Sequence, residues 1–346
     1  MNLKELFFSA MNGVPIKIPF NPFIMHLAAS LLNIEYSVYV QKPDVLVRGQ
    51  LKSSNFFGIE HLHVSTDAYR EASAWGVEVD FSGHTPVAKP GSELDWREFD
   101  SIDTPSLLES KRILNRLKAV KLLKKRSGSD QCIIGWIEAP FAEINCIFGM
   151  TNVMKIPYHS WESIIKKLID RIVPIQLEFA KLQIEAGADI IGAGDSAVSL
   201  IGPKKYEEAC LLGTKKLFNQ IEKKSPVLYH TCGDNSKTNN GRDMLKLIAN
   251  AGSSIIDIDY QVDLAIAKSK IGNEICIRGN VNTNLLANSE ISTEELIENM
   301  TTNIENGKPN GRYMFAAGCE WPWKLLNFAI RSLSLAKAVN EKIGYY

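Results

Sequence analysis

The stretch GADIIGAGD at residues 187–195 contains a short apolar run between two glycine-containing segments. It follows a segment, about 161–185, whose apolar residues recur at helical spacing, and it leads to a second helical pattern at about 203–221. Short apolar runs that alternate with longer amphipathic segments are typical of buried parallel strands joined by crossover helices. The stretch therefore predicts one strand–helix unit of an α/β protein.

The same unit recurs along the chain. Two further strands are predicted less clearly, near 57–63 and 76–81. Together these give about eight strand–helix units, the number that closes a (β/α)8 TIM barrel, and an open doubly wound sheet is the alternative. We expect a single domain over 1–346. The clearer runs are CIIGWI at 132–137, VLYHTCG at 227–233, SIIDIDY at 254–260, EICIRGN at 274–280 and RYMFAAG at 312–318.

Composition limits the kinds of partner. The chain has 346 residues, 39 basic and 39 acidic side chains, and 45% hydrophobic residues. A net charge of zero argues against nucleic acid or an anionic membrane as a partner, and no apolar run reaches the length of a membrane span. We expect a cytoplasmic protein with reduced cysteines, because its six cysteines are dispersed rather than clustered. The sequence allows a homodimer without fixing the oligomeric state.

Three residues form the candidate metal site. His230 and Cys232 are two apart on a predicted strand, so their side chains point to the same side. Cys319 follows the last predicted strand, and all three residues lie at carboxyl ends of strands, where a barrel builds its active site. Two thiolates and one imidazole suit Zn²⁺, and three protein ligands leave a fourth position for substrate. A buried cysteine that serves only as a small apolar residue is the alternative.

The motifs around these ligands resemble a known family. Together they are similar to the uroporphyrinogen decarboxylase superfamily, and above all to its corrinoid-dependent branch, which contains the methylcobamide:coenzyme M methyltransferases. The resemblance covers nearly the whole chain, though residues 1–120 match loosely. The motifs are H-T-C-G at 230–233, R-G-N at 278–280, A-G-C-E at 317–320, W-I-E-A-P-F at 136–141, G-A-D at 187–189 and G-D at 194–195.

The resemblance implies a TIM barrel that moves a methyl group from methylcobalamin or a related corrinoid, carried on a partner corrinoid protein, to a small thiol. Coenzyme M and homocysteine are the thiols we consider, and tetrahydrofolate is an alternative acceptor. The implied zinc ligands are His230, Cys232 and Cys319. Physical chemistry agrees, because coordination to zinc removes the proton of a thiol that is otherwise little ionised at neutral pH.

Other functions remain as alternatives. The decarboxylases of the superfamily hold a substrate rich in carboxylates with paired N-terminal arginines, whereas GVPIKIPF at 13–20 has none and the first arginine of the chain is Arg48. A zinc hydrolase would need a general base such as Glu138 or Asp195. A non-catalytic partner of a corrinoid protein would tolerate the loss of Cys232.

Several acidic residues are predicted to assist the metal site. Asp195 binds substrate or orients a ligand, or else caps the following turn. Glu320 orients His230 or a neighbouring donor, or else is a solvated carboxylate. Some relatives have an acid that approaches the zinc where this chain has Tyr260, and Asp259 is the nearby substitute.

Three residues are predicted to contact the corrinoid. Trp321 and Trp323 follow the last ligand and provide a flat apolar wall, or else pack the last helix onto the barrel. Asn280 lies at the end of a predicted strand and is expected to face the same side.

Overall fold

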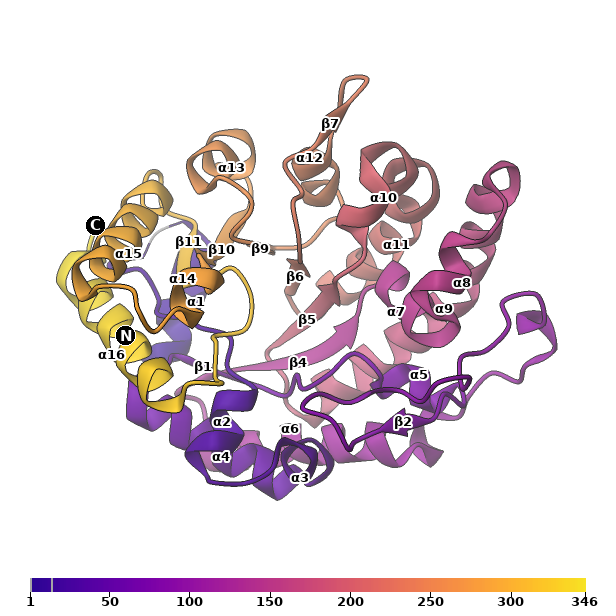
Figure 1. Ribbon diagram of the computed structural model, residues 1–346, viewed down its shortest axis with the longest axis horizontal. Coiled ribbons are helices and arrows are strands. Elements are labelled where there is room, and N and C mark those ends of the chain that lie inside the picture. The colour runs from indigo at the N-terminus through magenta and orange to yellow at the C-terminus, as the bar shows by residue number, and fades with distance from the viewer. Residues whose placement is uncertain (1, 14) are drawn as a thin grey trace.

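The computed structural model describes residues 2–13 and 15–346, so Met1 and the Val14 of segment 13–20 lie outside the described residues. A seven-stranded parallel sheet forms the centre, and its strands are neighbours in chain order. The sheet curls around an axis with helices outside it (Figure 1). Its strands are β1 (His61–His63), β4 (Cys132–Glu138), β5 (Ile190–Asp195), β6 (Val227–Thr231), β9 (Ile255–Ile258), β10 (Cys276–Val281) and β11 (Tyr313–Ala317).

An irregular segment, residues 19–23, lies between the first and last strands of this sheet. The Phe315 N–H of β11 donates to the Pro19 carbonyl (2.9 Å), and the Asn21 N–H donates to the Phe315 carbonyl (2.8 Å). On the other side, the Glu60 N–H donates to the Phe20 carbonyl (3.5 Å) just before β1. The segment therefore takes the eighth strand position, and the predicted TIM-barrel architecture is confirmed.

One predicted barrel strand is wrong. Residues 76–81 alternate in polarity as a strand does, but only β2 (Val79–Asp80) is extended, and it pairs antiparallel with β3 (Val87–Ala88) outside the central sheet. A second small hairpin joins β7 (Thr238–Asn239) to β8 (Arg242–Asp243). The alternating pattern indicated a strand correctly but could not tell which sheet the strand joins.

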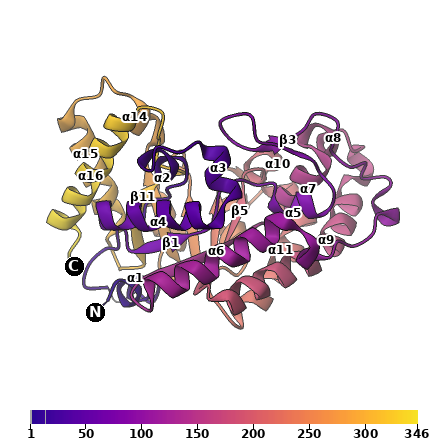
Figure 2. The ribbon, with the colours of Figure 1, turned by 90° about the horizontal axis from the view of Figure 1, so that it is seen from below.

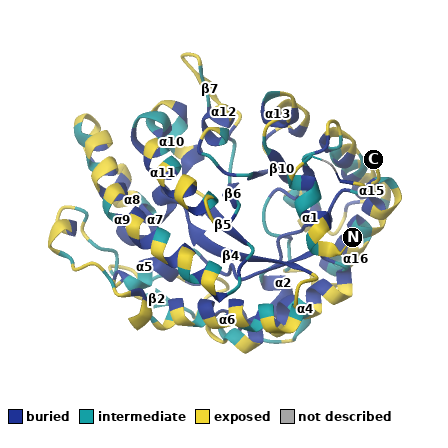
Figure 3. Cartoon of the chain, turned by 180° about the vertical axis from the view of Figure 1, so that it is seen from behind, coloured by how far each residue is buried: buried dark blue, intermediate teal, exposed yellow. Residues whose placement is uncertain are grey.

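The helices cover the outside of the barrel, with buried faces toward the sheet and exposed faces outward (Figure 3). The predicted helix at 161–185 is α9, which ends at Gly187 in a left-handed conformation (φ 112°), as a C-terminal glycine permits. The capping box predicted at Ser292 and Glu295 is also present. The larger helices are α1 (Leu3–Met11), α4 (Pro43–Phe57), α6 (Lys111–Ser127), α7 (Pro140–Phe148), α9 (Tyr158–Ala186), α10 (Val198–Lys205), α11 (Leu211–Glu222), α13 (Leu264–Ile271), α15 (Thr293–Gly307) and α16 (Leu326–Ile343).

Shorter helices follow several strand ends. In Figure 2 the helices α2 and α14 lie at the upper edge of the barrel with β3, and both chain termini lie at the lower edge. The upper edge is the end at which the strands finish, because α14 follows β10 and α2 follows the segment 19–23. The short helices are α2 (His26–Leu31), α3 (Tyr36–Gln41), α5 (Arg70–Ala74), α8 (Met150–Met154), α12 (Met244–Ala249) and α14 (Thr283–Ala287); 3-10 turns span Phe99–Ser101 and Leu107–Glu109, and a π-helical turn spans Tyr206–Cys210.

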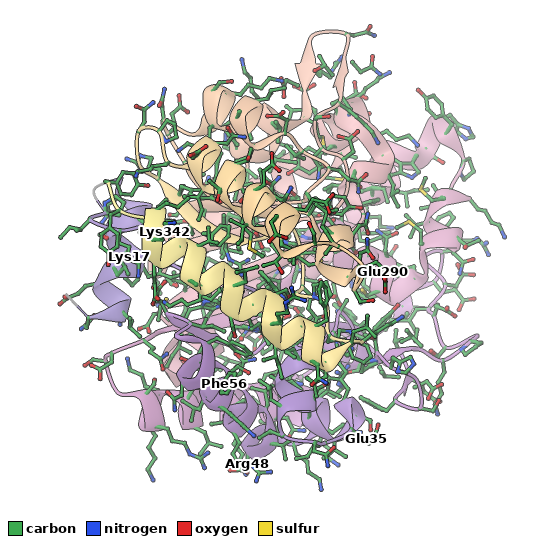
Figure 4. The ribbon with its side chains drawn as sticks, turned by 60° about the vertical axis from the view of Figure 1, so that its left-hand side comes forward. Lys17, Glu35, Arg48, Phe56, Glu290 and Lys342 are labelled. Atoms are coloured by element: carbon green, nitrogen blue, oxygen red, sulfur yellow. The ribbon has the colours of Figure 1, made fainter. Side chains whose placement is uncertain are left out.

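The two ends of the chain meet at the lower edge. Lys17 forms an antiparallel bridge with Tyr345, and Figure 4 shows Lys17 beside Lys342 at the C-terminal end of α16. One buried apolar cluster extends from Phe7 of α1 to Val339 of α16. Across residues 2–13 and 15–346, no helix is both long enough and apolar enough to cross a membrane.

Candidate metal centre

The three predicted ligands meet at the upper edge of the barrel. His230 is on β6, Cys232 follows the same strand, and Cys319 lies two residues after β11. The distances are 3.0 Å from His230 Nε2 to Cys232 Sγ, 3.8 Å from Nε2 to Cys319 Sγ, and 3.9 Å between the two sulfurs. All six cysteines are free, as the sequence predicts.

This geometry suits a tetrahedral cation site. Zn–S bonds of about 2.3 Å and Zn–N bonds of about 2.0 Å place ligand atoms roughly 3.6–3.8 Å apart. Two of the three observed separations, 3.8 and 3.9 Å, match this spacing, and the third is shorter at 3.0 Å. Among the described residues the group of His, Cys and acidic side chains around this point contains these three alone. The described residues therefore offer three of the four ligands that a tetrahedral zinc site uses.

Asp257 determines which nitrogen of His230 faces the sulfurs. The Oδ2 of this β9 residue lies 2.8 Å from His230 Nδ1, so Nε2 is left for the metal side. Arg278 of β10 donates from Nη1 to the same Asp257 oxygen and from Nε and Nη2 to the Asn21 carbonyl (2.9 and 2.7 Å). His230 is thus linked through Asp257 and Arg278 to the segment 19–23, which closes the barrel.

The sequence motifs assign no role to Asp257 or to Arg278. The signal for Asp257 is the D-I-D in SIIDIDY, because residues two apart on a strand point to the same side. That pattern offers two carboxylates, and the sequence reasoning singled out Asp259.

The charges around His230 favour a cation. Burial alone would lower the pKa of His230, but Asp257 and the Cys319 sulfur raise it more strongly, to about 10. The Cys232 thiol beside Cys319 and the nearby His230 hold the pKa of Cys319 well below its usual range. The site therefore favours positive charge between Asp257 and Cys319, and a metal ion supplies that charge as well as a proton does.

Asp259 and Asp195 hold the loop that carries Cys232. The Gly233 N–H donates to Asp259 Oδ2 (2.9 Å), and the Cys232 N–H donates to the Asp195 backbone carbonyl (3.1 Å). The Asp195 side chain accepts from the N–H groups of Ala197 and Val198 (3.1 and 3.2 Å), which is the turn-capping alternative. Both aspartates lie at the predicted edge, where they fix backbone rather than join the group of metal ligands.

Glu320 is not in contact with His230. Its Oε1 accepts from the N–H groups of Met25 and His26 (3.2 and 2.6 Å), and it lies 3.0 Å from His26 Nδ1. Glu320 therefore ties the loop after β11 to the start of α2, and Asp257 performs the orienting role that was predicted for Glu320.

The two tryptophans predicted to form an aromatic wall differ in exposure. Trp321 is fully buried and donates from Nε1 to Ser332 of α16 (3.1 Å), so it packs the last helix onto the barrel and cannot touch a ligand. Trp323 is partly buried, stacks on His26 (4.6 Å between ring centroids) and borders a cavity of about 530 Å³. Only Trp323 is placed where a ligand could reach it.

Asn280 and Tyr260 are occupied elsewhere. Asn280 is buried and donates from Nδ2 to the carbonyls of Asp259 and Val262 (2.9 and 2.6 Å), so it holds the loop after β9 rather than a ligand. The Tyr260 hydroxyl accepts from Asn284 Nδ2 (2.9 Å). The Asn280 side-chain amide is therefore already bound where a corrinoid contact was predicted, and the Tyr260 hydroxyl pairs with Asn284 rather than with the three candidate ligands.

Comparisons with known proteins agree with this fold. The family model described as uroporphyrinogen decarboxylase (URO-D) matches residues 2–333. A uroporphyrinogen decarboxylase of Citrifermentans bemidjiense is 25% identical over 263 residues, 73% of this chain and 74% of that protein. A methylcobamide:CoM methyltransferase, MtbA of Methanosarcina mazei, is 29% identical over 226 residues, 64% of each chain. The predicted resemblance to the superfamily and its corrinoid-dependent branch is confirmed.

Two solved structures show the same architecture. A methyltransferase from Methanosarcina mazei superposes with a TM-score of 0.84 at 18% identity, covering 99% of both chains. A B12-independent methionine synthase from Shewanella sp. W3-18-1 superposes with a TM-score of 0.55 at 12% identity, covering 94% of this chain and 97% of that one. At these identities the likeness establishes the fold alone.

Proposed function

Since this chain belongs to the uroporphyrinogen decarboxylase (URO-D) family, we propose that it is a zinc-dependent methyltransferase of that family, which moves a methyl group from a methylated corrinoid to a small thiol. The corrinoid is carried on a partner protein, and the thiol is of the coenzyme M or homocysteine kind. The observation that carries the proposal is the convergence of His230, Cys232 and Cys319 within 4.8 Å at the mouth of the barrel. A cytoplasmic location and a homodimer stay predictions.

The donor set suits thiol chemistry. When bound, zinc would lower the pKa of a coordinated thiol, so that the substrate sulfur is a thiolate. The thiolates of Cys232 and Cys319 cancel the charge of a divalent ion, which keeps a bound sulfur electron-rich. Asp257 holds His230 through Nδ1, so the imidazole presents Nε2 in a fixed direction. Of the three residues predicted to contact the flat corrinoid, Trp323 is the one that we still propose for this role.

Porphyrinogen decarboxylation is the second candidate, because several similar curated proteins carry that name. A substrate with several carboxylates needs free cationic side chains. Arg70 and Arg278 lie near the strand ends, but both are fully buried and bound to the carboxylates of Glu138 and Asp257. Neither is free to bind a substrate, so we rank this activity lower.

Assays on the unaltered protein distinguish these two activities. We expect about one zinc per chain by metal analysis, and demethylation of methylcobalamin that requires both the protein and a thiol. Tetrahydrofolate is tested in place of the thiol. Uroporphyrinogen in the same buffer should release no CO₂. Decarboxylation without thiol-dependent demethylation would overturn the proposal in favour of the second candidate.

Replacement of Asp257 by asparagine should weaken metal binding. The amide cannot supply the negative charge that the His230 imidazole faces at 2.8 Å. Loss of such an outer partner typically costs about 10–100-fold in metal affinity. Competition with a chromogenic chelator measures this change. Asp263→Asn, which alters an exposed helix-capping aspartate of α13, serves as the control and should leave the affinity unchanged.

A further inference from the structure

Two glycines of β5 leave a lane between Glu138 of β4 and His230 of β6 that β5 itself does not fill. The register of the sheet places Glu138 of β4 opposite Gly194 of β5, and Gly194 opposite His230 of β6. Two strand spacings of about 4.8 Å separate Glu138 from His230, and the residue of β5 in register between them is a glycine. A second glycine, Gly192, lies two residues earlier and faces the same side.

The side chains of β4 extend into this lane. The Trp136 ring covers both glycines: an added Cβ would lie 2.2 Å from it at Gly192 and 3.3 Å from its Nε1 at Gly194, and its centroid lies 6.5 Å from that of His230. Glu138 Oε2 lies 3.0 Å from the point where a Cβ on Gly194 would stand. A larger residue at Gly194 would therefore displace the carboxylate from the lane.

One oxygen of Glu138 is fixed and the other is free. Oε1 accepts from Arg70 Nη2 at 2.7 Å, which anchors the carboxylate. Within the part of the chain that the structure describes, no donor pairs with Oε2, and 8% of the side chain is exposed. The free oxygen is therefore the part of Glu138 that a small molecule or a water in the barrel mouth could reach.

The surroundings of Glu138 contain more carboxyl groups than guanidinium groups. The titratable groups that face it are Arg70 and Glu71 of α5 and Asp67 in the preceding loop, with Glu143 of α7 in the same buried cluster. Three glutamates share one guanidinium, because Asp67 is bound to a second arginine. Burial, opposed by Arg70 and reinforced by Glu71, raises the pKa of Glu138 to about 8. Its carboxylate is therefore a far better proton acceptor than an ordinary glutamate.

We propose that Glu138 is the base that accepts the proton of the substrate thiol as the thiol enters the metal centre. This inference rests on the proposed methyl transfer to a thiol. The S–H bond breaks, its electron pair stays on sulfur, and the proton passes to Glu138 Oε2 directly or through one water. The proton leaves to solvent before the next thiol binds.

Glu138→Gln tests this role, because glutamine keeps the shape and still accepts a hydrogen bond from Arg70. With an alkyl thiol, we expect kcat/KM to fall about 100-fold and to lose the rise with pH that the wild type shows through the pKa of Glu138. An aromatic thiol is already ionised at neutral pH and needs no base, so its turnover should change little. A merely structural role would slow both thiols equally.

Binding provides a readout that does not depend on turnover. Calorimetric titration of the alkyl thiol into the zinc-loaded protein, in buffers of different ionisation enthalpy, counts the protons released. A bound thiolate adds negative charge near Glu138 and so raises the pKa of Glu138 further. Just above the pKa that Glu138 has in the free protein, the wild type should therefore release fewer protons per thiol than Glu138→Gln, in which no carboxylate can take one up.

Two further variants sharpen the test. Glu71→Gln removes a negative neighbour that raises the pKa of Glu138, so the rise in kcat/KM should move to lower pH. Glu60→Gln is the matched control, because Glu60 is a buried carboxylate with a pKa raised by burial to about 7, but it lies before β1 at the opposite end of the barrel. Its pH profile should equal that of the wild type.

The outcomes separate this inference from the proposed function. If the wild type turns over thiols and Glu138→Gln shows the same pH profile and proton release, Glu138 is not the base although the methyltransferase stands. If the wild type shows no thiol-dependent demethylation, both fall. Equal slowing with alkyl and aromatic thiols also overturns the role of Glu138.

Discussion

Cys319→Ala is expected to abolish both stoichiometric zinc binding and thiol-dependent demethylation of methylcobalamin. The substitution leaves His230 of β6 and Cys232 just after that strand, and removes the ligand that follows β11. Two ligands are fewer than the three or four that protein zinc sites use. The loss of activity should exceed the roughly 100-fold that follows the loss of an outer partner.

The control for this experiment is Cys132→Ala. Cys132 of β4 is a fully buried free cysteine outside the metal centre, so the chemical change is the same and the position differs. We expect it to retain zinc and activity, at a modest cost in stability for the lost contacts. Metal analysis by mass spectrometry and the demethylation assay measure both variants. Full zinc content with surviving turnover in Cys319→Ala would contradict the proposed metal centre.

The parts of the fold that the sequence predicts well are its buried strands. The run CIIGWI is continuous and apolar, as a strand covered on both faces must be, and VLYHTCG begins with such a run before it reaches His230. The closing segment 19–23 lacks this signal. Two of its residues, Pro19 and Pro22, lack backbone N–H groups. The segment therefore cannot form a regular ladder of hydrogen bonds and is not recognisable as a strand.

The metal ligands are predictable because their positions follow from strand periodicity. The side chains of His230 and Cys232 must point to the same side, and Cys319, which follows the last strand, must lie at the same edge of the sheet. The partners of these ligands depend on distances between strands, which one sequence does not contain. Glu320 illustrates this: it follows Cys319 directly, yet its side chain is directed to His26 and the start of α2.

Arg278→Gln is expected to lower the free energy of unfolding by about 3–5 kcal/mol, the typical cost of leaving one partner of a buried ion pair alone. Arg278 is 1% exposed, and its guanidinium joins Asp257 to the Asn21 carbonyl of the closing segment. The variant therefore leaves a buried carboxylate without its cation and also loosens the eighth strand position. Urea denaturation followed by circular dichroism measures the change.

A double variant separates these two contributions. If the unpaired charge dominates, adding Asp257→Asn to Arg278→Gln should restore part of the lost stability, because a neutral amide replaces the isolated carboxylate. If the hydrogen bonds to Asn21 dominate, the double variant should be no more stable than Arg278→Gln alone. Arg331→Gln, at an exposed arginine of α16, controls for the loss of a surface charge and should change stability by less than about 0.5 kcal/mol. A similarly small effect of Arg278→Gln would show that Arg278 does not hold the barrel closed, and that His230 is oriented by Asp257 without its help.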